Sequence, residues 1–247
     1  MRTNRSIASL REDIARCLNQ LRLGALIEQL ELQYDNPAFS NQCFERRLFE
    51  ALQQTCDARS GKVFAKLMDT ANLSADVAQA DFEDYLVTPL SKKFSSLIDE
   101  LKTGEWMRAE RPLNLVIAGP TGAGKSWLAC AFARQACRLN LKVLYVTSTK
   151  AVLSRLNGNE TLMTKLIKTQ VLILDDFLLN QLTEMECQHM HIVIQARYQR
   201  RPMIILSQHP METWIQVLPS GSASDAIVDR IVHFTRYIQL TGEKSLR

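Results

Sequence analysis

Residues 119–126 read Gly119-Pro120-Thr121-Gly122-Ala123-Gly124-Lys125-Ser126, which fits the pattern G-x-x-x-x-G-K-[ST]. The stretch follows the apolar run 113–118 and precedes Trp127-Leu128-Ala129, which begins a helical pattern. Glycines let successive backbone N–H groups approach phosphates without a side-chain clash, and the following helix adds its positive N-terminal end. A glycine-rich turn can be purely structural. Here every position of the motif matches, and the stretch lies between an expected strand and an expected helix, which favours a nucleotide site.

This loop predicts ATP and Mg²⁺ as the bound groups. Lys125 is expected to bridge the β- and γ-phosphates, and the Ser126 hydroxyl is expected to ligate Mg²⁺. The predicted nucleotide-binding residues are Gly119, Pro120, Thr121, Gly122, Ala123, Gly124, Lys125, Ser126 and Trp127.

A second motif, Val171-Leu172-Ile173-Leu174-Asp175-Asp176, is a buried-strand pattern that ends in two carboxylates. Asp175 is placed to hold Mg²⁺ directly or through water, and Asp176 to orient or deprotonate the attacking water. Alone, the motif could be an acidic turn after a strand, but together with the phosphate loop it predicts an ATPase site. Position 176 holds Asp in place of the longer Glu, and from this shorter side chain we expect slow turnover of ATP.

The second part of the chain alternates short apolar runs with helical stretches. The runs are 113–118, 143–146, 171–174, 203–206 and 237–240. This alternation predicts an α/β fold, a five-stranded parallel sheet with helices on both faces. Ligands of such sheets bind beyond the carboxyl ends of the strands, which is where both motifs fall.

The first part of the chain is expected to be a small α-helical domain. Apolar residues recur at three- and four-residue spacing from Ile7 to Leu30, and again from Phe44 to Leu52. Asn36-Pro37 and Ser60-Gly61 are expected to end helices, and a shorter helix is expected to follow Gly61. The predicted division is a helical domain at 1–72, a linker at 73–88 and an ATPase domain at 89–247.

Charge is unevenly distributed. Residues 1–104 hold 13 Lys and Arg against 15 Asp and Glu, a net of −2, whereas residues 105–247 hold 17 against 11, a net of +6. A basic half that also carries the ATP motif suggests a polyanionic partner, although such a surplus can simply keep a domain soluble.

No stretch has the roughly 18 apolar residues of a membrane span, and the N-terminus lacks a signal-peptide pattern. The six cysteines show no C-x-x-C pair and are expected to be buried, reduced thiols. We therefore expect a cytoplasmic protein with no membrane partner.

Residues from about Asp81 to Arg247 resemble the IstB family of AAA+ ATPases, which assist insertion-sequence transposases and are related to the DnaC helicase loaders. The resemblance rests on residues 119–129, 172–176, Ser207-Gln208, 225–233 and 242–247. It implies an AAA+ fold and an oligomer that forms with ATP. The helical N-terminus resembles that family only in pattern and position.

The resemblance also implies roles for individual residues. Gln208 falls where the family keeps a polar sensor of the γ-phosphate, usually Asn. Arg230 matches the arginine that such ATPases insert into a neighbouring subunit's site, although by sequence context it could be an ordinary surface arginine. Lys244 is an insertion in the family's C-terminal Gly-Glu-Ser-x-Arg pattern, which leaves the role of Arg247 open.

DNA contacts are expected from cations on two helical stretches after the second strand, where related ATPases place DNA-contacting elements. The candidates are Lys150, Arg155, Lys165 and Lys168. Phosphate contacts need only spaced cations, so little sequence preference is expected. A solvated basic face is the alternative.

The function expected from sequence is ATP-dependent assembly on double-stranded DNA that assists a cognate transposase in selecting or remodelling its target. One alternative is a DnaC-like loader of a replicative helicase, which would prefer single strands. Another is an adaptor in which ATP binding switches partner affinity and hydrolysis is incidental.

Overall fold

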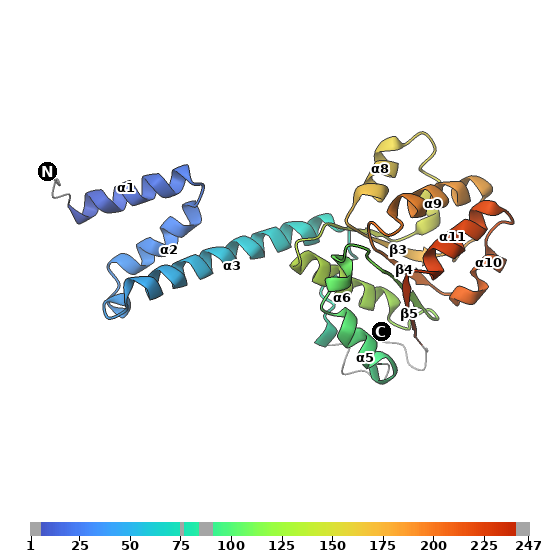
Figure 1. Ribbon diagram of the computed structural model, residues 1–247, viewed down its shortest axis with the longest axis horizontal. Helices are drawn as coiled ribbons and strands as arrows, with labels where there is room; N and C mark the ends of the chain where they lie inside the picture. The colour runs from blue at the N-terminus through green and yellow to red at the C-terminus, as the bar shows by residue number, and fades with distance from the viewer. Residues whose placement is uncertain (1–5, 75–76, 84–90, 241–247) are drawn as a thin grey trace. The chain divides into compact units, whose positions relative to one another are not determined.

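The computed structural model of the chain describes residues 6–74, 77–83 and 91–240 (Figure 1). Residue contacts divide the chain into two compact units, Met1–Val63 and Phe64–Arg247. This division falls within helix α3 (Phe44–Thr70), whereas the sequence places the end of the helical domain at residue 72. The predicted start of the ATPase domain at residue 89 lies outside the described residues.

The N-terminal unit is helical. It contains α1 (Ile7–Gln20), α2 (Gly24–Tyr34), the short η1 (Pro37–Phe39) and the first part of α3. Asn36-Pro37 does end a helix, since α2 stops at Tyr34. The expected break at Ser60-Gly61 is wrong, because α3 is one continuous helix there. A Cβ at Gly61 would meet nothing within 4 Å, so this glycine costs the helix only about 1 kcal/mol of intrinsic propensity.

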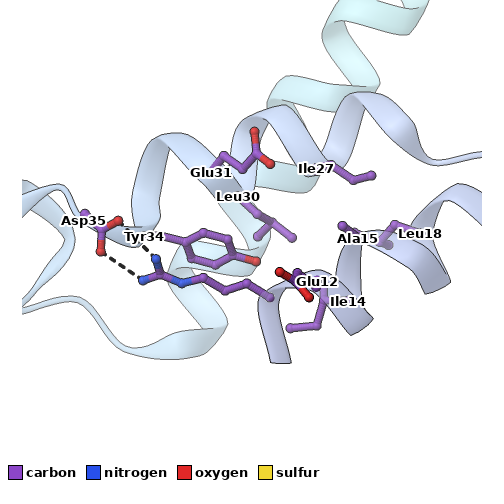
Figure 2. A pocket seen from close by; sticks show the side chains of 10 residues that line it. Glu12, Ile14, Ala15, Leu18, Ile27, Leu30, Glu31, Tyr34 and Asp35 are labelled. Atoms are coloured by element: carbon purple, nitrogen blue, oxygen red, sulfur yellow. Dashed lines mark hydrogen bonds and ion pairs between the residues drawn. The ribbon is translucent and has the colours of Figure 1, made fainter. Parts of the chain in front are cut away.

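A cavity of about 330 Å³ lies between α1 and α2 (Figure 2). At one end of it, Arg11 makes a bidentate ion pair with Asp35 at 3.0 and 3.1 Å and stacks over the Tyr34 ring at 4.3 Å. Apolar side chains, among them Leu18, Ile27 and Leu30, line much of the remainder, together with Glu12 and Glu31. These contacts close α1 and α2 into a helical hairpin.

The second unit is built on a parallel sheet. Its strands are β1 (Asn114–Ala118), β2 (Val143–Val146), β3 (Val171–Phe177), β4 (Met203–Ser207) and β5 (Thr235–Gln239). They lie in the order β2-β3-β4-β1-β5, and every neighbouring pair is parallel. The predicted α/β fold with five parallel strands is confirmed.

Helices cover both faces of this sheet (Figure 1). They are α5 (Ser91–Leu101), η2 (Glu105–Met107), α6 (Lys125–Arg138), α7 (Thr149–Leu153), α8 (Glu160–Lys168), α9 (Glu184–Arg197), η3 (Met211–Thr213), α10 (Trp214–Val217) and α11 (Ser222–Val232). Side chains of α5 and α6 form one core with alternate strand residues such as Tyr145 and Ile173. The intervening strand residues, such as Leu144 and Leu172, form a second core with α8, α9 and α11. This alternation follows from the two-residue period of a strand.

Within the second unit, described residues between α3 and α5 contact the sheet and α6. The backbone N–H of Tyr145 on the edge strand β2 donates to the Ala71 carbonyl at 2.8 Å, and the Asn72 amide donates to the Tyr145 carbonyl at 3.0 Å. Phe82 is buried edge-to-face against Phe132 of α6. Ala71 and Asn72 thus cover a sheet edge, and Phe82, which lies in the predicted linker, covers part of the core. Residues 75–76 and 84–88 of the linker lie outside the described residues.

Two expectations on composition can be compared with the structure. No helix within the described ranges is long and apolar enough to cross a membrane. All six cysteines are free, as predicted, but the expectation that all are buried is wrong. Cys130, Cys137 and Cys187 are buried, and Cys17, Cys43 and Cys56 are exposed. The exposed thiols all belong to the thin helical unit, which has too little core to cover them.

Candidate nucleotide-binding site

The phosphate loop connects β1 to α6, as the motif requires. Gly122 and Gly124 have φ angles of 81° and 86°, in the left-handed region that glycine adopts readily. Gly119 is needed for a different reason, since a Cβ there would lie 2.6 Å from the carbonyl oxygen of Leu240, just after β5. The loop is therefore turned tightly against the sheet, and its N–H groups lead into the N-terminus of α6.

Lys125 is the first residue of α6 and is buried. Its ammonium donates to the carbonyls of Gly119 at 2.8 Å and Pro120 at 2.9 Å. Burial lowers the pKa of Lys125, while the charges of Asp175 and Asp176 oppose that shift. The ammonium thus lies inside the phosphate loop, where it can exchange loop carbonyls for phosphate oxygens.

Ser126 and Asp175 meet directly across the site. The Ser126 hydroxyl donates to Oδ2 of Asp175 at 3.0 Å, and the backbone N–H of Asp176 donates to Oδ1 at 2.8 Å. The Tyr145 hydroxyl also donates to Oδ2 of Asp175. Sequence reasoning missed Tyr145, although Tyr145 pairs with Ile173 and Asp175 lies two residues further along the same face of β3.

Asp176 lies at an irregularity of β3, where the register with β4 shifts between Leu174 and Phe177. Its φ angle is 51°, which Asp tolerates better than most residues. Burial raises the pKa of the Asp176 carboxyl, the nearby charge of Asp175 raises it further, and Lys125 opposes both. A carboxylate with a raised pKa that lines a cavity suits a group that accepts a proton from water.

These groups line one cavity of about 770 Å³, within the range of small-molecule sites. Of the predicted residues, Thr121, Gly122, Gly124, Lys125, Ser126, Trp127, Asp175, Asp176 and Gln208 line it. Ser74, Val77 and Thr147 also line it and were not foreseen, because nothing in their own sequence marks them. The donor set fits ATP and Mg²⁺: loop N–H groups and a lysine for phosphates, and a hydroxyl with a carboxylate for the metal ion.

Arg230 does not line this cavity. It lies in α11, where its guanidinium donates to the Ala226 carbonyl one turn earlier at 3.1 Å. Arg247 lies outside the described residues.

The four predicted DNA-contacting cations do not converge. Lys150 is in α7, just beyond the carboxyl end of β2, and its ammonium donates to the Gln181 carbonyl at 2.5 Å. Arg155 is exposed in a turn after α7 and not on a helix. Lys165 and Lys168 are exposed at the end of α8, next to the start of β3 and therefore at the opposite edge of the sheet.

Comparisons with known proteins identify the family of the chain. A family model described as IstB-like ATP binding protein matches residues 16–247. The chain is 30% identical over 236 residues to a putative insertion sequence ATP-binding protein (y4uH) of Sinorhizobium fredii, covering 93% of each protein. It is 34% identical over 206 residues to the putative ATP-binding protein of insertion sequence IS1162 from Pseudomonas fluorescens, covering 79% of this chain and 85% of the relative.

Solved structures give the fold. DnaI superposes with a TM-score of 0.61 at 19% identity, covering 74% of this chain and 100% of DnaI. The DnaC helicase loader superposes with a TM-score of 0.51 at 17% identity, covering 68% of this chain and 99% of DnaC. With a parallel sheet, a phosphate loop after β1 and paired carboxylates on β3, the chain belongs to the IstB-like ATP-binding proteins and has their AAA+ P-loop fold.

Proposed function

We propose that the chain hydrolyses ATP with Mg²⁺, completes its active site between subunits, and assembles on double-stranded DNA to assist a cognate transposase. The observation that carries the proposal is the single cavity that gathers Lys125, Ser126, Asp175 and Asp176. A site for nucleotide binding alone needs the phosphate loop, but it does not need a second carboxylate whose pKa is raised.

The residues divide the chemistry among them. Bound Mg²⁺ would neutralise charge on the phosphates, and Ser126 and Asp175 are the groups that would hold it. Lys125 exchanges the carbonyls of Gly119 and Pro120 for β- and γ-phosphate oxygens. Asp176 orients the attacking water and accepts its proton, and Gln208 contacts the γ-phosphate side from the end of β4.

Arg230 supplies the remaining positive charge from a neighbouring subunit. It is half-exposed and lies outside its own cavity, which supports a role in trans. A donated arginine typically contributes roughly 10³ to 10⁵ in rate. A lone subunit is therefore expected to hydrolyse poorly, and specific activity should rise with protein concentration.

The proposed role in transposition rests on the relatives, whose names link them to insertion sequences. The loader alternative is supported only by fold, because DnaI and DnaC are under 20% identical to this chain. A preference for single-stranded over duplex DNA would favour the loader. Normal transposition by a variant that cannot hydrolyse ATP would favour the adaptor.

A mixing experiment tests the shared site. Arg230→Ala keeps an intact cavity but has no arginine to donate, and Lys125→Ala keeps the arginine but cannot use its own cavity. Each variant alone should be inactive, and the mixture should regain part of the ATPase activity. Light scattering with an ATP analogue must first show that the variants co-assemble. A mixture that assembles and stays inactive contradicts the shared site.

A further inference from the structure

Five cations lie at the edge of the sheet where the parallel strands begin, opposite to the nucleotide cavity. They are Lys142 before β2, Lys165 and Lys168 at the end of α8, and Arg200 and Arg201 before β4. We call this set the amino-edge cluster. All except the half-exposed Arg201 are exposed, and across the described ranges none of the five forms an ion pair.

Hydrogen bonds around Gln170 and Arg197 bring these cations together. The Lys142 backbone N–H donates to the Gln170 side chain at 2.7 Å, and Gln170 is two residues from Lys168. The buried Arg197 guanidinium donates to the Gln170 carbonyl at 3.3 Å and to the Pro202 carbonyl at 2.8 Å. Arg200 and Arg201 both donate their backbone N–H groups to the Arg197 carbonyl, at 2.9 and 3.0 Å.

The plain explanation for such cations is that they complement the negative C-terminal ends of α8 and α9. Arg197 already does this by direct contact, because its guanidinium donates to the carbonyls of Leu166 at 2.8 Å and Thr169 at 2.7 Å at the end of α8. Lys165 and Lys168 do lie in the last turn of α8, but Lys142, Arg200 and Arg201 are not in the last turn of any described helix. The helix ends therefore do not account for these three cations, and no ion pair compensates them within the described ranges.

We propose that the amino-edge cluster binds the phosphate backbone of duplex DNA, a proposal that rests on the proposed function. Spaced cations without base-reading groups suit backbone contacts. Proteins that bind single strands add aromatic side chains on which bases stack. The cluster contains no aromatic residue, and the ring of the neighbouring Tyr198 is engaged edge-to-face with Phe234 at 5.6 Å. These features favour a duplex over a single strand.

The test compares two paired substitutions with a matched control in the full-length protein. Lys165→Ala/Lys168→Ala and Arg200→Ala/Arg201→Ala each remove two cluster charges. Lys62→Ala/Lys66→Ala removes two exposed lysines, also without ion pairs, from α3. Binding of two unrelated duplexes and of a single strand of equal length is measured against salt concentration, with a non-hydrolysable ATP analogue present.

For duplex DNA, the slope of the logarithm of the binding constant against the logarithm of the salt concentration should be smaller in magnitude by about 1.8 in each cluster variant. Each of the two lost phosphate contacts contributes about 0.9 to this slope. Both duplexes should be affected alike, and affinity for a fluorescent ATP analogue should be unchanged. The control should match the unaltered protein. Unchanged slopes in both cluster variants, or tighter binding to the single strand, would overturn the proposal.

Two further outcomes separate this proposal from the proposed function. If the unaltered protein does not bind duplex DNA, the proposed function itself fails. If Arg200→Ala/Arg201→Ala loses ATP turnover while its DNA slope is normal, these arginines serve a neighbour's nucleotide and the proposed cluster is wrong.

Discussion

Asp176 allows catalysis and stability to be separated by two substitutions at one position. Asn has the size and polarity of Asp and tolerates the left-handed φ angle of 51° at position 176. Ala is smaller and apolar and does not tolerate that angle well. Placing Ala in that conformation costs about 1–2 kcal/mol. In a domain of this size, that cost lowers Tm by roughly 2–8 °C. The Ala variant is therefore expected to melt below the Asn variant, although both lose the same carboxylate.

Turnover should fall in both variants by the same factor. A positioned base contributes roughly 10²- to 10⁴-fold in rate, so steady-state phosphate release should fall by that amount. ATP should stay bound, because Lys125 and the loop are unaltered, and calorimetry with ATP and Mg²⁺ checks this. Asp175→Asn serves as the control, since it should lose the effect of Mg²⁺ on ATP binding. Phosphate release within threefold of normal in Asp176→Asn would refute the role of Asp176.

The raised pKa of Asp176 also sets the sign of a pH effect on stability. The folded chain holds this proton more tightly than the unfolded chain, so stability is lost as pH rises from the unfolded pKa through the raised pKa, and the loss is complete above it. At neutral pH, Asp176→Asn should thus be at least as stable as the unaltered protein. The difference should shrink as pH falls through the raised pKa towards about 3.9, the value of an unperturbed Asp. A difference that grows on acidification would contradict the assigned shift.

Two other predictions follow from single hydrogen-bonded groups. Tyr145→Phe removes the hydrogen bond to Asp175 and should raise the Mg²⁺ concentration needed for half-maximal binding of an ATP analogue by about tenfold, since a hydrogen bond to a charged group contributes about 1.5 kcal/mol or more. Affinity for the analogue in EDTA should be unchanged. As a control, Tyr237→Phe, outside the cavity, should bind the analogue and Mg²⁺ like the unaltered protein. Arg197→Met should reduce the free energy of unfolding in urea by about 1–3 kcal/mol, because it leaves buried carbonyls at the end of α8 without donors. Arg200→Met, at an exposed site, should change it by less than about 0.5 kcal/mol.

The sheet and the phosphate loop could be predicted because their signals are local. A buried parallel strand is a continuous apolar run, and the loop motif has fixed spacing. The continuity of α3 past Gly61 could not be predicted, because the about 1 kcal/mol cost of a glycine in a helix is outweighed by the residues around it. Exposure of cysteines in the N-terminal unit depends on how little core that unit has, which residue patterns do not reveal.

Site residues near the carboxyl ends of the expected strands were predicted. Site residues that reach the cavity from other parts of the fold were missed. Asp175 and Asp176 end the apolar run of β3 and were found from that position, whereas Gln208, directly after β4, was implied by the family resemblance. Tyr145 was missed because its hydroxyl reaches Asp175 only once β2 pairs with β3 in the observed register. Ser74 reaches the cavity through the path of the chain after α3, which no motif encodes.

The positions of the proposed sites limit how DNA can influence hydrolysis. Lys168 precedes β3 and Asp176 lies near its far end, and a seven-residue strand spans about 20 Å. That distance exceeds the Debye length of about 8 Å in physiological salt, so phosphates at the amino-edge cluster have little direct effect on the same subunit's cavity. On the proposed function, DNA would instead stimulate hydrolysis by holding subunits next to one another, so that Arg230 of one subunit reaches the cavity of another. Stimulation by DNA should then disappear in Arg230→Ala even though DNA binding persists.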